Sequence, residues 1–431
     1  MSYSRKWKLG KPFTILAKKE LAGELCCPSL YSLPCGDLII IYYDQGDFYF
    51  SRTKMIRSID QGITWRPEEC PIPSVSCVMK LGNVVRMYDQ NTFLVKDSSP
   101  TQYVFQYCDS FDGGRTFGPK CFSFYEHDGE HVRKIGSLNK IHLLYDNLTY
   151  WENVLTAAGW KRDEWDDIES GNHGPAPQTY LQLPDGSLLN ILYSYCDRQF
   201  TGKPYIYDLM AAFSTDGGIH WRYLSQLNPP HSEADEGYAE GSAVMLNNGD
   251  IYVAMRHGGG GWPIMQTISK DYGRSWEELK PINDKVRGVW PKIVRLSDGS
   301  FAMCHGRPGI YLMFDSGENG CDWEVDDRLD IWDVEQLTLT TNAKPVTSRV
   351  DVRDYMSCIA VPKEQLKWAR QNLLSGYFCS WENVTFVEVQ PGRILLVYDL
   401  QNYIEYPGAC PQKVIRGVWI EKAGSSQSDS Q

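Results

Sequence analysis

Five copies of one eight-residue pattern, Ser-x-Asp-x-Gly-x-x-Trp, limit the fold of this chain more than any other feature. In such a segment the Asp and Ser side chains accept hydrogen bonds from backbone N–H groups, Gly adopts a positive φ, and Trp packs the turn onto a sheet. The pattern therefore predicts a tight turn between two strands. The copies are Ser58–Trp65, Ser110–Phe117, Ser214–Trp221, Ser269–Trp276 and, with Glu318 in the Asp place, Ser316–Trp323.

The spacing of the copies indicates a repeat architecture. They start 52, 104, 55 and 47 residues apart. A period of about fifty residues is the length of one four-stranded propeller blade. The interval of 104 residues covers two periods, so one blade lacks its copy or a long insertion lies there. We expect an all-β fold, a β-propeller of six or seven four-stranded antiparallel blades, with the copies as structural turns.

A second pattern marks the first two strands of a blade. It is an apolar run, a turn with Gly, and another apolar run, which predicts a β-hairpin. The first strand of each hairpin should start at the central mouth of the propeller, so the opening residues of successive blades converge on one funnel, where we expect the ligand. The hairpins begin at Cys27, Pro177, Glu240, Trp290 and Asn383.

On these two patterns the chain resembles the sialidase superfamily of Asp-box, or BNR-repeat, β-propellers, from about Pro28 to Tyr398. Glu240 lies nine residues before the hairpin glycine Gly249, and Arg256 lies seven residues after it. In sialidases that pairing belongs to the carboxylate that assists the nucleophile and to one arginine of the triad that grips the substrate's carboxylate. The resemblance therefore implies a glycoside hydrolase that acts on an acidic glycan.

Two further residues match the family's site. Arg307 resembles the third arginine of the triad, and two arginines on one pocket favour an anion because guanidinium groups bind carboxylates bidentately. Asp47 resembles the general acid/base, although the loop length differs and Asp44 is an alternative.

Two landmarks of the family are missing. The place of the first arginine reads Cys26-Cys27, and the place of the tyrosine nucleophile, nine residues before Gly392, reads Asn383 with Glu382 beside it. Tyr377 is six residues out of register. These departures argue against an ordinary sialidase, and we assign Glu382 and Asn383 to substrate binding.

Three more residues are candidates for the funnel. His173 opens another funnel strand, and histidine titrates near neutral pH, so it is either a proton-transfer group or a structural histidine. Trp262 and Trp290 either stack on a sugar face or pack between blades.

Three functions remain open at this point. A hydrolase would use Asp47 as the acid and Glu240 as the base, with Arg256 and Arg307 holding the anionic group. A lyase acting on a uronic-acid linkage of the rhamnosyl-glucuronate type would use the arginines to neutralise the carboxylate and His173 as the base. A non-catalytic glycan-binding propeller is the third alternative, because propellers host many functions.

Composition narrows the setting of this chain. A net charge of −11 argues against nucleic acid or an anionic membrane as partner, although not against an acidic oligosaccharide or polysaccharide in a basic pocket. The N-terminal sequence has no apolar signal region, and the 13 cysteines are irregularly spaced, which together predict reduced thiols and a cytoplasmic location, or secretion if a leader has been removed.

We expect one propeller domain over 1–422 with an insertion near 151–172, and a disordered tail over 423–431. The sequence contains no zinc-type cluster and predicts no cofactor. A calcium ion bound by backbone carbonyls in the axial channel would leave no sequence pattern, so that ion stays open. The oligomeric state has no sequence signal.

Overall fold

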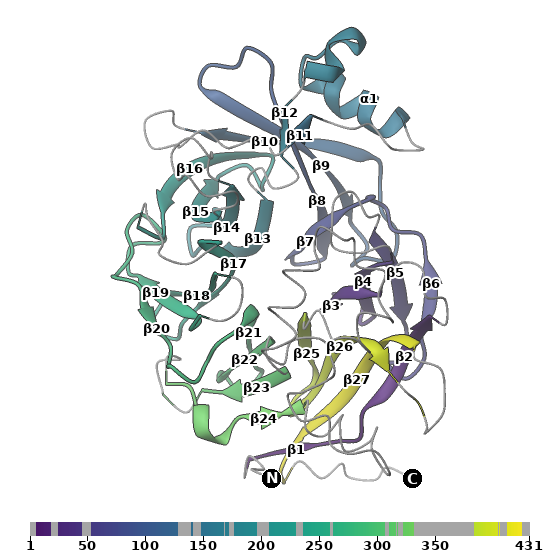
Figure 1. The fold of residues 1–431 in the computed structure, drawn as a ribbon, viewed down its shortest axis with the longest axis vertical. Coiled ribbons are helices and arrows are strands. Elements are labelled where there is room, and N and C mark those ends of the chain that lie inside the picture. Colours follow the sequence, from purple (N-terminus) through teal and green to yellow (C-terminus); the bar gives the residue numbers. More distant parts are fainter. Residues whose placement is uncertain are drawn as a thin grey trace, which may run out of the picture. The chain divides into compact units, whose positions relative to one another are not determined.

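The computed structural model describes most of the chain, in two compact units. The first unit is Met1–Ser32, Gly36–Cys70 and Asn283–Gln431, and the second is Leu33–Cys35 and Pro71–Ile282. The described residues are 6–18, 25–44, 53–127, 139–140, 148–167, 169–171, 176–195, 207–229, 236–258, 262–306, 310–315, 317, 322–331, 383–403, 405 and 412–424. Their regular secondary structure is almost entirely β-strand, so the all-β prediction is confirmed (Figure 1).

The first unit contains three antiparallel sheets, each built around consecutive strands that form a meander. The third meander obtains its outer strands from the chain's beginning, because β1 and β2 both pair with β27. The strands are β1 (Trp7–Leu9), β2 (Phe13–Lys18), β3 (Cys26–Ser32), β4 (Leu38–Tyr43), β5 (Thr53–Ser58), β6 (Arg66–Glu68), β21 (Val289–Arg295), β22 (Phe301–Gly306), β23 (Ile310–Phe314), β24 (Leu329–Asp330), β25 (Val384–Gln390), β26 (Arg393–Tyr403) and β27 (Gln412–Lys422), with the short 3-10 helix η2 (Val325–Asp327).

The second unit also contains three four-stranded meanders, two of which join into one sheet through the parallel pairing of β10 with β16. Its strands are β7 (Val75–Leu81), β8 (Val84–Leu94), β9 (Thr101–Ser110), β10 (Lys120–His127), β13 (Ala176–Gln182), β14 (Leu188–Tyr195), β15 (Tyr207–Ser214), β16 (His220–Gln226), β17 (Tyr238–Met245), β18 (Ile251–His257), β19 (Met265–Ser269) and β20 (Lys280–Pro281).

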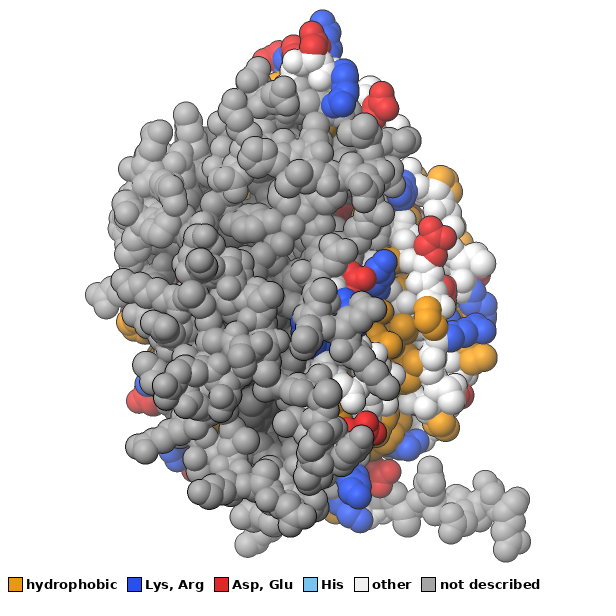
Figure 2. Space-filling view, turned by 45° about the vertical axis from the view of Figure 1, so that its right-hand side comes forward, with side chains coloured by type: hydrophobic (Ala, Val, Ile, Leu, Met, Phe, Trp, Pro, Cys, Tyr) orange, Lys and Arg blue, Asp and Glu red, His pale blue; other side chains and the backbone are white. Residues whose placement is uncertain are grey.

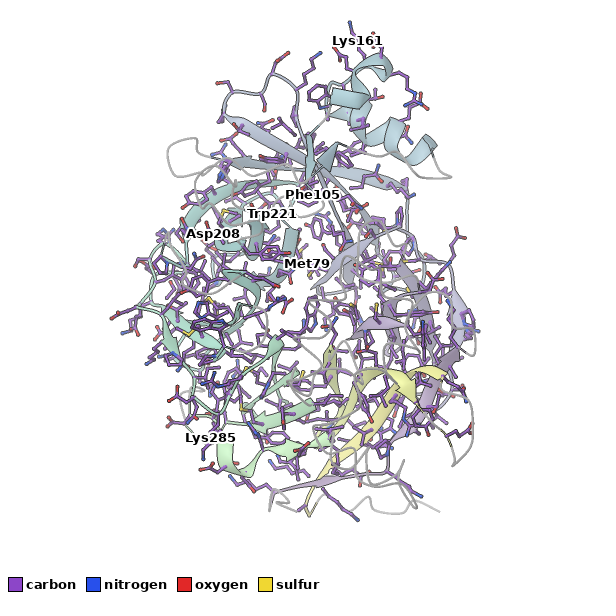
Figure 3. The ribbon with its side chains drawn as sticks, viewed as in Figure 1. Met79, Phe105, Lys161, Asp208, Trp221 and Lys285 are labelled. Atoms are coloured by element: carbon purple, nitrogen blue, oxygen red, sulfur yellow. The ribbon has the colours of Figure 1, made fainter. Side chains whose placement is uncertain are left out.

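The second strands β18 and β22 are mostly apolar because both of their faces are covered. β22 is buried at every position, and β18 at all but one. Within each unit, neighbouring meanders pack face to face. In the second unit, for example, Met79, Phe105 and Trp221 share one apolar cluster between β7–β10 and β13–β16 (Figure 3). Such packing places the start of each first strand and the end of each second strand at one edge.

The repeated octapeptide forms the turn after the third strand, as predicted. In the third copy, Ser214 Oγ donates to Asp216 Oδ1 (2.8 Å), and Gly218 N donates to Ser214 Oγ (2.9 Å). The first, second and fourth copies repeat these two bonds. In the degenerate fifth copy Asp315 takes over, because its Oδ1 accepts from the N–H groups of Gly317 and Asp322 (3.0 Å each). Glu318 lies outside the described residues.

The long interval between the second and third copies contains an insertion. The described residues there form α1 (Leu148–Ala157), the 3-10 helix η1 (Arg162–Asp167) and two short strands, β11 (Asn139–Lys140) and β12 (Glu169–Gly171). β12 pairs with β8, and β11 pairs with β12. Val154 and Leu155 of α1 pack on Phe93 and Val104, which fixes the helix on its sheet. No helix within the described part of the chain is long and apolar enough to cross a membrane.

Charged side chains of both signs are interspersed on the face shown in Figure 2, as far as the described residues reach. The described residues on this face therefore show no large basic surface, which a nucleic-acid partner would need.

Candidate active site

The first strand of three meanders begins with an unusual backbone conformation. Cys27, Glu240 and Trp290 all have φ of 54°. Each lies nine residues before its hairpin glycine, and each accompanies a break in the pairing of the first two strands. A non-glycine residue at positive φ costs on the order of 1–3 kcal/mol and persists only where the surrounding structure imposes it. The fold therefore directs these three side chains at the start of a first strand, where the sequence predicted the funnel.

Glu240 and Arg256 form the centre of the candidate site in the second unit. Arg256 lies on β18 and donates through Nη1 to Glu240 Oε1 (2.7 Å). Its Nη2 donates to Glu236, and its Nε donates to the Gly258 carbonyl (2.6 Å). Both members of the predicted pair are thus in contact, and a second carboxylate, which the sequence did not reveal, completes the group. We call Glu236, Glu240 and Arg256 the carboxylate–arginine cluster.

The two carboxylates of the cluster raise the pKa of Arg256. Burial alone lowers the pKa of the Arg256 guanidinium, but the Glu240 and Glu236 carboxylates outweigh burial and raise that pKa above its usual value. Arg256 is therefore always charged. Two carboxylates therefore share the one guanidinium of the cluster.

Aromatic rings surround the strand ends that carry the cluster. Tyr238 stacks on His257 with 4.5 Å between ring centroids, and His257 lies 5.1 Å from Trp262. Trp262 is 38% exposed, which is unusual for a large apolar side chain. An exposed ring beside partly buried carboxylates is what a sugar-binding surface requires, with a face for stacking and oxygen acceptors for hydroxyl groups.

The first unit brings together the two positions at which this chain departs from sialidases. Asn383 Nδ2 donates to Cys27 Sγ (2.6 Å), and both side chains are buried. The resemblance to sialidases implies the first arginine and the tyrosine nucleophile at these two positions, and that alignment stays a prediction. Trp290 is the second residue of β21 in the same unit.

Four predicted site residues, Asp47, His173, Arg307 and Glu382, lie outside the described residues. Tyr377 also lies there. The alternative acid, Asp44, is partly buried, and its carboxylate lies 3.8 Å from Lys54 Nζ. The roles of Asp47, His173, Arg307 and Glu382 therefore stay predictions.

The described residues contain no group of three or more His, Cys, Asp or Glu side chains that would bind a metal ion. Backbone carbonyls, which could bind a calcium ion, are not among these groups, so that ion stays open as it did in the sequence.

A buried carboxyl group elsewhere in the second unit was also not singled out from the sequence. Asp89 lies on β8, seven residues after the hairpin glycine Gly82, which is the place that Arg256 takes after Gly249. Its Oδ1 accepts from the backbone and side-chain N–H groups of Asn91 (2.8 Å each), whereas its Oδ2 has no partner among the described residues. Burial raises the pKa of Asp89 to about 7, in spite of these hydrogen bonds.

We expect Asp89→Asn to stabilise the protein at alkaline pH. Because the pKa of Asp89 is raised on folding, the folded state holds a proton that the unfolded state releases near pH 4, and stability falls as the pH rises from about 4 to about 7. The variant should remove this decline, which is on the order of 2–4 kcal/mol, and should match the wild type near pH 4. Urea unfolding at pH 4.5 and pH 8 measures the difference. Equal stability of the two proteins at pH 8 would contradict the assignment.

Comparisons with known proteins find a related repeat domain and solved structures that share this fold. Residues 172–374 match the family model described as a BNR repeat-like domain. The solved structure of a protein of unknown function from Dyadobacter fermentans covers 97% of this chain and 100% of its own, with TM-score 0.58 and 14% identity. A Hadza microbial sialidase covers 96% of this chain and 68% of its own (TM-score 0.53, 14% identity). Over residues 172–374 the chain therefore matches a BNR repeat-like domain, and its fold is sialidase-like.

This sialidase-like fold is shared by enzymes that act on different sugars. An α-L-arabinanase from Penicillium chrysogenum covers 96% of this chain and 98% of its own, with TM-score 0.50 and 11% identity. At such identities the likeness establishes the fold, and these neighbours are glycoside hydrolases. A sequence search among curated proteins finds no match to the chain.

Proposed function

We propose that this protein is an exo-acting glycoside hydrolase. The observation that carries the proposal is the position of Glu240, a carboxylate that a strained backbone holds at the start of an inner strand and that Arg256 keeps oriented. Two carboxyl groups on either side of the scissile bond are what most glycosidases use. The fold shared with a sialidase and an arabinanase supports this reading.

In the proposed mechanism Glu240 is the base and Asp47 is the acid. The Glu240 carboxylate activates a water molecule for attack on the anomeric carbon, and Asp47 protonates the leaving oxygen. Asn383 stands where the family has its tyrosine nucleophile, so we expect direct attack by water and inversion at the anomeric carbon. Proton NMR of the first-formed product tests the stereochemistry, and a retained configuration would contradict direct attack.

We also propose that the six described meanders are blades of one propeller, and six is the lower of the two predicted numbers.

An acidic glycan as substrate was predicted from Arg256 and Arg307. Arg256 already donates to two carboxylates of its own chain, and Arg307 lies outside the described residues. The acidic substrate therefore stays a prediction, whereas the proposal of a carbohydrate substrate rests on the fold and the cluster.

Product masses test the proposed reaction. The protein is incubated with sialyl, glucuronyl, rhamnosyl-glucuronate and arabinofuranosyl oligosaccharides, and the products are weighed by mass spectrometry. We expect products whose summed mass exceeds that of the substrate by one water. Products that sum to the substrate mass and absorb ultraviolet light would show elimination and replace the proposal with the lyase alternative. Binding without turnover across the panel would favour the glycan-binding alternative.

A further inference from the structure

Glu236 occupies the side of Arg256 that an incoming carboxylate would need. Arg256 Nη1 is paired with Glu240, its Nη2 with Glu236, and its Nε with the Gly258 carbonyl. A guanidinium recognises an external carboxylate best through two parallel N–H groups at one edge. Here each edge of the Arg256 guanidinium that carries an Nη atom already faces a glutamate of the same chain.

The position of Glu236 also differs from that of Glu240 in exposure. The Glu236 side chain is 29% exposed, whereas the side chains of Glu240 and Arg256 are 12% exposed. Glu236 comes just before β17, and its carbonyl accepts from the Tyr207 N–H (2.9 Å), which ties this residue to β15. Glu236 is thus a fixed carboxylate at the more open side of the cluster, where a substrate would approach.

We propose that Glu236 is a specificity-determining residue that makes this site select an uncharged sugar over a carboxylate-bearing one. The inference rests on the proposed function, since it names the substrate class of that site. A uronate or sialate carboxylate that bound to Arg256 would have to displace one of these glutamates and would lie close to its carboxylate, which repels a like charge. An uncharged sugar meets no such repulsion, because its hydroxyl groups donate hydrogen bonds to carboxylate oxygens.

The aromatic surroundings fit the same class of ligand. Trp262 offers an exposed ring on the loop after β18, next to His257. An uncharged pyranose or furanose ring can lie on this indole while its hydroxyl groups face Glu236 and Glu240. A substrate held in this way needs no arginine triad, which accounts for the cysteines at the place of the family's first arginine.

Matched pairs of methyl glycosides test the inference, each pair having the same ring with either a hydroxymethyl or a carboxylate group, for example methyl glucoside and methyl glucuronide, and methyl galactoside and methyl galacturonide. Calorimetry or saturation-transfer NMR at low salt compares their dissociation constants. For at least one pair, we expect the wild type to bind the uncharged member at least about tenfold more tightly. Glu236→Gln should abolish or reverse this preference, because it removes one negative charge and frees Arg256 Nη2.

The control is Glu68→Gln in the first unit. Arg57 there lies between Glu68 and Asp37 much as Arg256 lies between its glutamates, but at the opposite end of the strands, beside the first octapeptide turn. This control should keep the wild-type preference.

A wild-type preference for the uronates, or an unchanged ratio in Glu236→Gln, would overturn the inference while leaving hydrolysis intact. Failure of the wild type to bind any member of any pair would overturn the proposed function, and the inference with it.

Discussion

Glu240→Gln is expected to lower kcat on the best substrate of the panel by about 10²–10⁴-fold. The substitution keeps the size of the side chain and one oxygen for Arg256, but it removes the charge that would activate water. Arg256 keeps its ion pair with Glu236, so the local structure should survive. Initial rates measured under substrate saturation, with thermal unfolding on the same preparations, separate a catalytic loss from a loss of folded protein.

Glu277→Gln is the matched control for this loss. Glu277 also lies in the second unit and pairs with Lys270 (2.7 Å), but on an exposed surface, where an ion pair contributes little. Its activity should equal that of the wild type. Turnover by folded Glu240→Gln within about threefold of the wild type would show that another group is the base.

Gly218→Ala is expected to destabilise the second unit by about 2–5 kcal/mol. Gly218 belongs to the third octapeptide turn, and its φ is +84°, which strains any residue with a Cβ. A Cβ there would lie 2.4 Å from the hydroxyl oxygen of Tyr88 and 2.9 Å from the ring of Trp221, both of which are fully buried. Overpacking of this kind adds about 1–3 kcal/mol to the strain.

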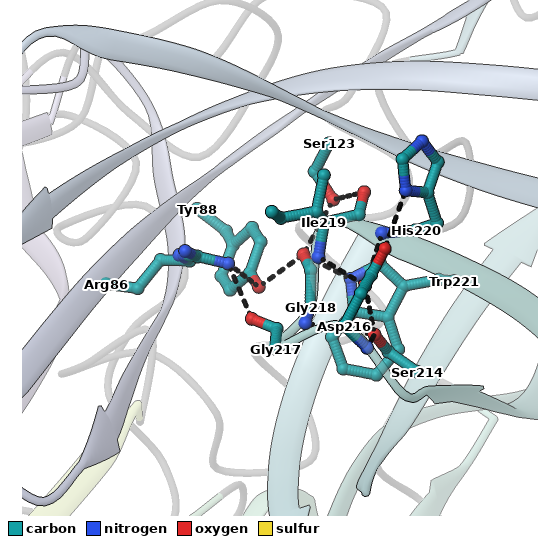
Figure 4. A network of polar contacts seen from close by, with 10 residues as sticks. All are labelled: Arg86, Tyr88, Ser123, Ser214, Asp216, Gly217, Gly218, Ile219, His220 and Trp221. Atoms are coloured by element: carbon teal, nitrogen blue, oxygen red, sulfur yellow. Dashed lines mark hydrogen bonds and ion pairs between the residues drawn. The ribbon is translucent and has the colours of Figure 1, made fainter.

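The loss would be large because this turn connects two meanders (Figure 4). The Gly218 carbonyl accepts from the Tyr88 hydroxyl (2.9 Å), from Ser123 Oγ (3.0 Å) and from Trp221 Nε1 (3.0 Å). Arg86, which is paired with Asp109, donates to the neighbouring Gly217 carbonyl (2.7 Å). A shifted turn would therefore break several buried hydrogen bonds at once.

Gly217→Ala isolates the packing effect from the backbone effect. Gly217 has φ of +74°, but a Cβ there meets no atom within 4 Å. This variant should lose only the strain of about 1–2 kcal/mol. Chemical denaturation followed by tryptophan fluorescence compares the two variants. Equal losses within about 0.5 kcal/mol would refute the proposed role of the Tyr88–Gly218 contact.

The sequence predicted the turns well because its repeats are local. Each octapeptide contains its own hydrogen-bond partners, so Ser214, Asp216 and Gly218 were sufficient to place a tight turn between two strands. The hairpin of β7 and β8 was missed, since its turn at Gly82 lacks the Asp-Gly or Asn-Gly pair that marks most of the others. The helix α1 in the long interval, in contrast, agrees with the insertion that the spacing allowed.

The site was predictable only where it follows the register of the hairpins. Glu240 and Arg256 are a fixed number of residues from Gly249, so the fold brings them together. Glu236 precedes the strand and has no register of its own, and its contact with Arg256 depends on how the chain enters β17. Asp89 had no signal either, because burial of a carboxyl group depends on neighbouring strands rather than on the local sequence.

A crystal structure of the Glu240→Gln variant with an uncleaved oligosaccharide from the panel tests whether Glu240 faces the scissile bond. We expect the scissile sugar to lie at the start of β17. Its anomeric carbon should lie within about 4 Å of the substituted side chain or be separated from it by a single water molecule. We also expect one ring on Trp262. An oligosaccharide bound away from Arg256 and Trp262, with its anomeric carbon facing another carboxyl group, would contradict this expectation.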